Sequence, residues 1–322
     1  MSESLRNGDL PERIRVGVSA CLLGNEVRFD GGHKRSRFIT DELACYFDFV
    51  SYCPEVAIGL GIPRQPIRLT GDPDNPQATG VRDPELNVTQ PLREYGRKVA
   101  TEISGLRGFI FKKDSPSCGM ERVRVYVNDS PTKNGTGLFA QRVMENFPYL
   151  PVEEEGRLGD PGLRENFIQR VYVLYRWRQL VAEGLSVHRL AQFHARHKLI
   201  IMSHNQNAVR ELGKLIASGD QDVQQVAEKY LNGLMTWLKV PATRGNQVNV
   251  LQHIQGYLKR NLDAADKAEL AEVIEKYRLG ELPLIVPVTL LKHHFRKSPD
   301  EYIDQSYYMN PYPAELCLLN HI

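Results

Sequence analysis

Three cysteines each follow a short β-prone run that stops at a glycine or a proline. Residues 108–119 read GFIFKKDSPSCG, an apolar run that ends in polar residues and is followed by Cys118. The runs VGVSACLLG at 16–24 and FVSYCPE at 49–55 put Cys21 and Cys53 in the same setting. Open α/β sheets carry their chemistry at the carboxyl ends of the strands. The pattern therefore predicts three sulfur atoms at strand ends.

The spacing of these cysteines excludes the close CxxC pairs of zinc fingers and thioredoxin-like redox sites. Cys21 and Cys53 are 32 positions apart (53 − 21), and Cys53 and Cys118 are 65 apart (118 − 53). Folding alone can bring them together. Two interpretations of the pattern stay open: a shared metal site, or three small buried hydrophobic side chains.

The composition predicts a cytoplasmic globular protein with no membrane partner. The chain has 322 residues, enough for two domains, of which 42% are hydrophobic and 25% charged. No apolar run approaches the roughly 20 residues that cross a bilayer, and the first ten residues lack the apolar core of a secretory signal. Five cysteines, an odd number, favour reduced thiols over a disulfide scaffold. The net charge of +2 is spread evenly and indicates nothing about nucleic acid.

The first half has the pattern of an α/β domain with a mainly parallel sheet, because strand-like and helix-like segments alternate along it. Two loops rich in Gly, Pro and Asp, residues 30–35 and 59–83, are long enough to predict a functional role. The expected strands are residues 14–19, 49–53, 108–111 and 123–127, and the expected helices are residues 36–47, 92–104 and 138–147.

The second half has the pattern of an all-α domain. Three acidic residues and a glycine at 153–156 predict a solvated link, so the two domains are expected at 1–152 and 153–322. Beyond this link the apolar residues recur at helical spacing. They do so from Leu163 to Leu174 and over residues 212–217, 223–238, 248–262 and 268–279.

Histidines and basic residues gather in this second half. Six histidines match no zinc spacing, which favours hydrogen-bonded core or surface groups over a metal site: His194, His197, His204, His253, His293 and His294. The segments HARHK at 194–198 and KHHFRK at 292–297 are basic patches with aromatic neighbours. That pattern is typical of contacts with RNA phosphates and stacked bases. A solvated basic helix face explains it equally well.

The first half resembles the thiouracil desulfidase family. Five motifs occur in the order of the family and span nearly all of residues 14–150, which makes the resemblance far more specific than any single cysteine. The motifs are SACLLG at 19–24, DGGH at 30–33, CPE at 53–55, GIPRQPIRL at 61–69 and SPSCG at 115–119.

The second half is similar to the YbgA-like domain. Together the two halves resemble the architecture of tRNA 4-thiouridine desulfidases, in which the helical half is expected to bind RNA. Four segments carry this second resemblance: HKLIIMSH at 197–204, NQVNVLQHIQGY at 246–257, VPVTLL at 286–291 and YYMNPYP at 307–313.

The resemblance implies a 4Fe-4S cluster held by Cys21, Cys53 and Cys118. Four irons and three thiolates leave one iron without a protein ligand, and an open coordination position separates a catalytic metal site from a structural one. A soft iron site also suits a sulfur atom. Cys45 and Cys317 fall outside the motifs, in apolar surroundings, and are expected to be packing residues.

The resemblance also implies a hydrolytic reaction that removes sulfur from 4-thiouridine in tRNA and leaves uridine, with no net redox change. Electron withdrawal by the open iron makes ring carbon C4 more electrophilic, so that water attacks it. Glu55 is expected to take the proton from that water and to return one when the C–S bond breaks. Ser115 is expected to hydrogen-bond the ring or the water. The structural alternatives are a helix-start acid for Glu55 and a turn oxygen for Ser115.

A base in folded tRNA must be turned outward to reach such a centre, which requires contacts with the RNA backbone. The expected contacts lie beside the first and third cysteine loops and in the two basic patches: Lys34, Arg35, Arg37, Lys112, Lys113, Lys198, Arg296 and Lys297. Three other functions stay open. They are a desulfidase of free 2- or 4-thiouracil, a non-catalytic iron–sulfur sensor that binds RNA, and a structural zinc protein.

Overall fold

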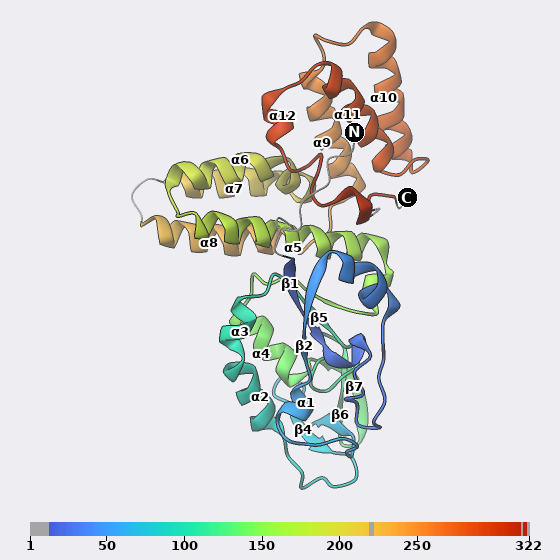
Figure 1. Cartoon of the computed structure of the whole chain (residues 1–322), viewed down its shortest axis with the longest axis vertical. Helices are drawn as coiled ribbons and strands as arrows, with labels where there is room; N and C mark the ends of the chain where they lie inside the picture. Colours follow the sequence, from blue (N-terminus) through green and yellow to red (C-terminus); the bar gives the residue numbers. More distant parts are fainter. Residues whose placement is uncertain (1–12, 219–221, 317, 321–322) are drawn as a thin grey trace, which may run out of the picture. The chain divides into compact units, whose positions relative to one another are not determined.

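The computed structural model of the chain describes residues 13–218, 222–316 and 318–320. The chain divides into two compact units between Gly159 and Asp160. The first unit mixes strands and helices and the second is rich in helix, as the sequence predicts (Figure 1). The division lies seven residues beyond the expected boundary at 152/153 (159 − 152).

The first unit is built on a four-stranded parallel sheet, sheet A. The chain runs from β1 to β2 on one side of β1 and later enters β5 on its other side. The strand order therefore reverses at β1, and in open α/β sheets ligands bind outside the carboxyl ends at such a point. In spatial order, the strands are β2 (Phe47–Tyr52), β1 (Ile14–Ser19), β5 (Phe109–Phe111) and β8 (Val152–Glu154).

Aromatic side chains form the core against sheet A. The rings of Phe109 and Phe111 stack with centroids 4.3 Å apart, and Phe139 meets both of them edge to face. Gly17 in β1 is required for this packing, because a Cβ there would lie 2.4 Å from Cδ2 of Phe109. The helices on this side of the unit are α2 (Thr89–Lys98), α3 (Ala100–Ser104) and α4 (Leu138–Asn146) (Figure 1).

A second sheet occupies part of the segment that the sequence predicts to be a long loop. The loop prediction for residues 59–83 is wrong, because a hairpin forms there around alternating buried residues such as Ile67 and Leu69. Pro and Gly on either side hide the strand pattern. The sheet has the order β4 (Gln77–Gly80), β3 (Ile67–Thr70), β6 (Val123–Val127) and β7 (Ser130–Gly135), with β3 and β6 parallel.

Of the other elements expected in the first half, some are confirmed and some are not. The strands at 14–19 and 123–127 are confirmed, and the helix at 92–104 is divided into α2 and α3. The helix expected at 36–47 is wrong: a π-helical turn and a 3-10 turn take its place, η2 (Phe38–Glu42) and η3 (Leu43–Cys45). Thr40 turns its hydroxyl to the carbonyl of Ser36 (3.2 Å), a local bond that competes with regular helix.

Two further expectations concern cysteines outside the motifs. Cys45 is exposed, so its assignment as a packing residue is wrong. It ends the 3-10 turn η3, where the apolar helix face expected around it does not form. Cys317 lies outside the described residues.

The acidic segment expected to be a solvated link is buried instead. Glu153 and Glu154 are 3% and 6% exposed and belong to β8, the last strand of sheet A. Oε1 of Glu153 accepts a hydrogen bond from Nε of Arg157 (2.6 Å), and Oε1 of Glu154 accepts one from the backbone N–H of Met120 (2.8 Å). Buried carboxylates are tolerated because they are paired in this way.

The second unit contains eight helices among the described residues. Side-chain caps fix several of their starts: Asp160, Ser186 and Asn205 accept backbone N–H groups at the N-termini of the first three. No helix in the described part of the chain is long and apolar enough to cross a membrane. The helices are α5 (Pro161–Ala182), α6 (Val187–His204), α7 (Gln206–Ala217), α8 (Val223–Leu238), α9 (Arg244–Tyr257), α10 (Ala264–Leu279), α11 (Ile285–Lys297) and α12 (Glu301–Gln305).

Candidate functional site

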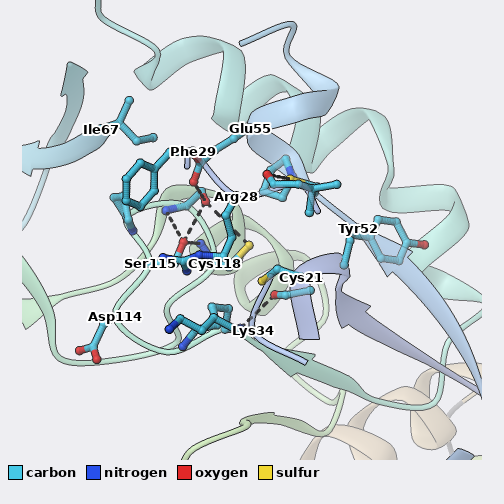
Figure 2. A pocket seen from close by; sticks show the side chains of 18 of the residues that line it. Cys21, Arg28, Phe29, Lys34, Tyr52, Glu55, Ile67, Asp114, Ser115 and Cys118 are labelled. Atoms are coloured by element: carbon cyan, nitrogen blue, oxygen red, sulfur yellow. Dashed lines mark hydrogen bonds between the residues drawn. The ribbon is translucent and has the colours of Figure 1, made fainter. Parts of the chain in front are cut away.

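The carboxyl ends of three neighbouring strands open onto one cavity of about 410 Å³ (Figure 2). Cys21 lies in the turn η1 (Ala20–Leu23) directly after β1, and Cys53 lies between β2 and the short helix α1 (Pro54–Ala57). Cys118 follows the end of β5 by seven residues (118 − 111). All three thiols line the cavity, whose volume is that of a small-molecule or cofactor site.

The three thiols lie within electrostatic reach of one another. Burial raises the pKa of Cys21 to about 11, although the ammonium group of Lys112 acts in the opposite direction. Burial also raises the pKa of Cys53 and, far more strongly, that of Cys118. The neighbouring thiols of Cys53 and Cys21 raise the pKa of Cys118 further. Three sulfur atoms that cannot easily ionise together therefore share one buried space.

The donor set fits an iron–sulfur cluster. Cysteine thiolates are the usual ligands of such clusters, whereas hard cations such as Mg²⁺ and Ca²⁺ select oxygen. Within residues 13–218, 222–316 and 318–320, no three His, Cys, Asp or Glu side chains are grouped closely enough to hold a metal ion as they stand. The fit therefore rests on the kind and number of donors and on the shared cavity.

Glu55 lies in the first turn of α1, and both of its carboxylate oxygens are held. Arg64 donates to Oε2 from Nε (3.0 Å) and Nη2 (2.9 Å), and Ser117 donates from Oγ to Oε1 (2.7 Å). The Arg64 side chain is 5% exposed and that of Glu55 is 14% exposed. Nη2 of Arg64 also donates to the carbonyl of Val27 (2.9 Å). The carboxylate is therefore fixed in the cavity by a buried, two-pronged ion pair.

A directed chain of hydrogen bonds runs from Ser115 to Glu55. Oγ of Ser115 accepts from the backbone N–H groups of Ser117 (3.3 Å) and Cys118 (3.0 Å), and the two serine hydroxyls are 3.0 Å apart. Because Ser117 gives its proton to Glu55, the hydroxyl of Ser115 is the donor between the two serines. Ser115 closes the turn that carries Cys118, the structural alternative raised by the sequence, and it also reaches Glu55 through Ser117.

The side-chain carboxylates of Glu154 and Glu155, at the end of β8 and just after it, hold the loop that carries Cys118. Glu154 accepts from Met120 on one side of the cysteine. On the other side, Oε2 of Glu155 accepts from the backbone N–H of Lys113 (2.8 Å), and Oε1 pairs with Nζ of Lys112. The acidic segment therefore positions the third thiol.

The structure brings part of the predicted basic set to the cavity. Lys34, Lys112 and Lys113 line it; Lys34 and Lys113 are exposed, whereas Lys112 is paired with a carboxylate. Arg35 forms an exposed ion pair within its own segment, and neither Arg35 nor Arg37 lines the cavity. The remaining candidates belong to the second unit: Lys198 on α6, and Arg296 and Lys297 on α11.

Three residues of the site were missed by the sequence prediction: Arg64, Ser117 and Phe29. The first two lie inside the motifs GIPRQPIRL and SPSCG, which are the signal that could have identified them. Phe29 lines the cavity and is 37% exposed, while its carbonyl accepts the backbone N–H of Arg64 (2.9 Å). The guanidinium of Arg28 lies 5.3 Å from the centre of the Phe29 ring. Figure 2 shows Phe29, Arg28, Glu55 and Ser115 around the same space.

Profiles of two families match separate parts of the chain. The 2-thiouracil desulfurase family matches residues 16–155, and a family of proteins of unknown function, DUF1722, matches residues 198–313. The three motif cysteines and Glu55 all lie within the first match.

Two curated proteins and one solved structure are similar to parts of the chain. Uncharacterized protein YbgA of Escherichia coli (strain K12) is 31% identical over 151 residues, which cover 46% of this chain and 89% of the relative. Uncharacterized protein YbbK of Bacillus subtilis (strain 168) is 36% identical over 112 residues, 32% of this chain and 71% of the relative. The structure of the 4Fe-4S-dependent thiouracil desulfidase TudS is 29% identical and covers 46% of this chain and 94% of that chain. The TM-score of this match is 0.38.

Proposed function

The chain belongs to the 2-thiouracil desulfurase family in its first unit and to the DUF1722 family in its second, and on that premise we propose a tRNA 4-thiouridine desulfidase. The cofactor in this proposal is a 4Fe-4S cluster on Cys21, Cys53 and Cys118, with one iron free of protein ligands. The observation that carries the proposal is the convergence of these three thiols on a cavity that also contains the fixed carboxylate of Glu55.

The residues of the cavity have distinct parts in the proposed reaction. When bound, the cluster supplies a soft Lewis acid for the thiocarbonyl sulfur. Glu55 orients a water molecule toward ring carbon C4 and takes its proton. Arg64 and Ser117 keep the carboxylate in place through the hydrogen bonds described above. The bond from C4 to oxygen forms, the C–S bond breaks, and thiouridine plus water becomes uridine plus hydrogen sulfide.

The rim of the cavity supports a nucleotide substrate that carries phosphates. Lys34 and Lys113 are exposed there and form no ion pair with a described residue. Phe29 offers an accessible ring on which a base can stack, a contact worth about 1–3 kcal/mol per base. Free cations beside an open aromatic ring are the usual features of a site that binds single-stranded nucleic acid.

The helical unit adds features that suit RNA. Arg296 and Lys297 are exposed in the last turn of α11. Arg196 is exposed on α6, and its guanidinium lies 5.2 Å from the ring centre of Tyr307. The basic segment 194–198 is not wholly a surface patch, because His197 is completely buried. RNA binding by this unit is part of the proposal.

A free thiolated base is the second candidate substrate. The name of the matching family refers to 2-thiouracil, a free base. The cavity in the first unit has room for a base alone. Both candidate substrates would need the same cofactor and the same carboxylate. They differ in whether the base is attached to an RNA chain.

Anaerobic purification tests the proposed cofactor and reaction together. The full-length protein should be brown, contain iron and sulfide, and remove 4-thiouridine absorbance from tRNA without added reductant. Cys118→Ala should lose iron and turnover, whereas Cys45→Ala is the matched control and should keep both, because Cys45 is exposed and does not line the cavity. Colourless, zinc-loaded protein would contradict the proposal.

A pair of lysine changes separates tRNA from free base. Replacing Lys34 and Lys113 by Ala should lower kcat/KM for tRNA and flatten its dependence on salt by up to about two units of slope, since each lost phosphate contact removes about 0.7–0.9. Turnover of free 4-thiouracil should not change. Lys133→Ala, an exposed lysine of β7, is the control. If wild-type protein converts free 4-thiouracil but not thiolated tRNA, the tRNA assignment is wrong.

A further inference from the structure

The second unit contains a cavity of about 180 Å³ that the proposed reaction does not use. It is lined from the start of α5, the end of α6, the start of α9 and the end of α10. Polar side chains dominate the lining, and burying them costs free energy unless they find partners. Six of them are between 6% and 8% exposed: Glu165, Asn166, Gln169, His204, Gln247 and Tyr277.

Three of the four segments that carry the resemblance of the second half meet at this cavity. The segment 197–204 supplies His204, and the segment 246–257 supplies Gln247. Tyr308, from the segment 307–313, donates its hydroxyl to Oε1 of Gln247 (2.6 Å). Residues that the desulfidase proposal leaves unexplained are therefore gathered in one place.

Hydrogen bonds fix the direction of the groups around His204. Burial lowers the pKa of His204 to about 4, so the ring is neutral. Nδ1 lies 2.6 Å from the carbonyl of Val240 and must carry the ring proton. Nε2 is then an acceptor, so the Gln169 amide, whose Oε1 lies 2.8 Å from it, must be turned over to present its NH₂ group there. The oxygen of Gln169 is left as a spare acceptor.

With the described residues as partners, two further side-chain amides use only one of their two hydrogen-bonding groups, either the oxygen or the NH₂. Gln247 accepts from Tyr308 through its oxygen, and Asn166 donates from Nδ2 to the carbonyl of Leu238 (2.9 Å). Within the described ranges, no hydrogen-bond partner is present for the NH₂ group of Gln247 or for Oδ1 of Asn166. The cavity therefore presents a donor from Gln247 and acceptors from Asn166 and Gln169.

The two ionisable groups of the lining, Arg244 and Glu165, each have contacts or surroundings within the second unit that bear on their charge. Nη1 of Arg244 approaches the carbonyl of Tyr277 (3.5 Å), close to the C-terminus of α10, where a cation is favoured. Burial raises the pKa of Glu165 to about 7, so burial disfavours the charged carboxylate there. The spare amide donor and acceptors carry no charge, so they suit a neutral molecule.

We propose that this cavity binds a small neutral heterocycle with adjacent N–H and C=O groups, the chemical class of the pyrimidine bases. The spare donor of Gln247 and the spare acceptors of Asn166 and Gln169 line the same cavity and together match the groups of such an edge. The volume corresponds to about six water molecules in the liquid, so it suits a single ring and is too small for a nucleotide. The inference does not depend on what the first unit does.

Uracil is the probe, titrated into the full-length protein by calorimetry. A dissociation constant on the order of 1 mM or tighter is expected for so small a ligand. Gln247→Glu keeps the oxygen that Tyr308 needs and removes the spare NH₂ group, so it should weaken binding at least about tenfold. Gln252→Glu, an exposed residue of the same helix, is the control and should bind as wild type does.

The first unit offers a competing site, and variants there distinguish the two. Phe29→Ala should leave the Gln247-dependent binding unchanged. If uracil binding is lost in Phe29→Ala and kept in Gln247→Glu, the ligand lies in the first unit and the inference is wrong. If no uracil binds at about 10 mM, well above the expected dissociation constant, the cavity holds only water and the inference is also wrong. Gln247→Met, checked for folding by circular dichroism, serves if Gln247→Glu does not fold.

Discussion

Replacing Arg64 by Met should destabilise the first unit by about 3 kcal/mol. Arg64 is 5% exposed and donates to Glu55 and to the carbonyls of Val27 and Gly61. Methionine fills most of the space of the side chain but leaves a nearly buried carboxylate without its cation. Breaking a buried pair from one side costs about 3–5 kcal/mol. The lower end is expected, because Glu55 keeps its hydrogen bond from Ser117 and is still 14% exposed.

Arg68 provides the matched comparison, four positions along the same segment. It pairs with Asp129 at 3.0 Å, but the side chain of Asp129 is 84% exposed and that of Arg68 is 30% exposed. Exposed pairs contribute about 0–1 kcal/mol. The guanidinium lies 4.8 Å from the ring centre of Tyr126, which adds about 0.5–1 kcal/mol at an exposed site. Arg68→Met should therefore cost about 1 kcal/mol.

Hydrogen exchange read peptide by peptide separates the two units in the full-length chain. Arg64→Met should accelerate exchange of the slowest amides of β1 and β2 by more than about 100-fold, because each 1.4 kcal/mol is a factor of ten. The amides of α5 should not change and serve as the internal reference. Adding Glu55→Gln to Arg64→Met should recover about 1 kcal/mol or more, since the uncompensated charge is removed. Equal effects of Arg64→Met and Arg68→Met would refute the reasoning.

Phe29→Ala should raise KM for a 4-thiouridine mononucleotide by about 5- to 150-fold, because base stacking is worth about 1–3 kcal/mol, whereas Phe29→Tyr should not; steady-state kinetics measures both. Ser117→Ala should lower kcat by about tenfold or more with unchanged iron content, because Glu55 loses its fixed orientation. Between pH 7 and 5 the second unit should lose stability, because burial lowers the pKa of His197 to about 3 and of His204 to about 4. The unfolded rings bind protons below about pH 6.5 and the folded ones do not, so each costs about 2 kcal/mol at pH 5. Glu165, with its pKa raised to about 7, takes up a proton in the folded state first and offsets about 2 kcal/mol of this loss. Glu165→Gln should therefore show the full loss in urea unfolding followed by Trp177 fluorescence.

The strands that position the thiols could be predicted because their patterns are strong and local. Residues 14–19 form β1 as expected, and β2 and β5 lie within two residues of their expected bounds. Each run is apolar, β-branched or aromatic, and each stops at a residue that breaks it. The second sheet could not be predicted, since β3 and β4 are short and lie among prolines and glycines whose turn propensity dominates any local pattern.

The candidate site was predicted in its residue types but not in its contacts. The motifs identified Cys21, Cys53, Cys118 and Glu55, and the structure brings all four to one cavity. The partners of Glu55 come from nine and 62 positions away, Arg64 and Ser117, and no periodicity reports such contacts. The acidic run at 153–155 was misinterpreted for a similar reason. A run of charges is usually solvated, and its burial here depends on amide and guanidinium donors that are remote in the sequence.

The three thiols are held in place in different ways. Cys21 and Cys53 follow their strands directly, so sheet A itself fixes them. Cys118 lies seven residues beyond β5, and its place depends on Ser115 within its own turn and on the carboxylates of Glu154 and Glu155 beyond it. Because Glu154 is the last residue of β8 and Glu155 follows it, we expect Cys118 to be held at the cavity only when β8 is paired in the sheet. We therefore predict that a chain ending before β8 lacks a positioned Cys118, because the two carboxylates that hold its loop are missing.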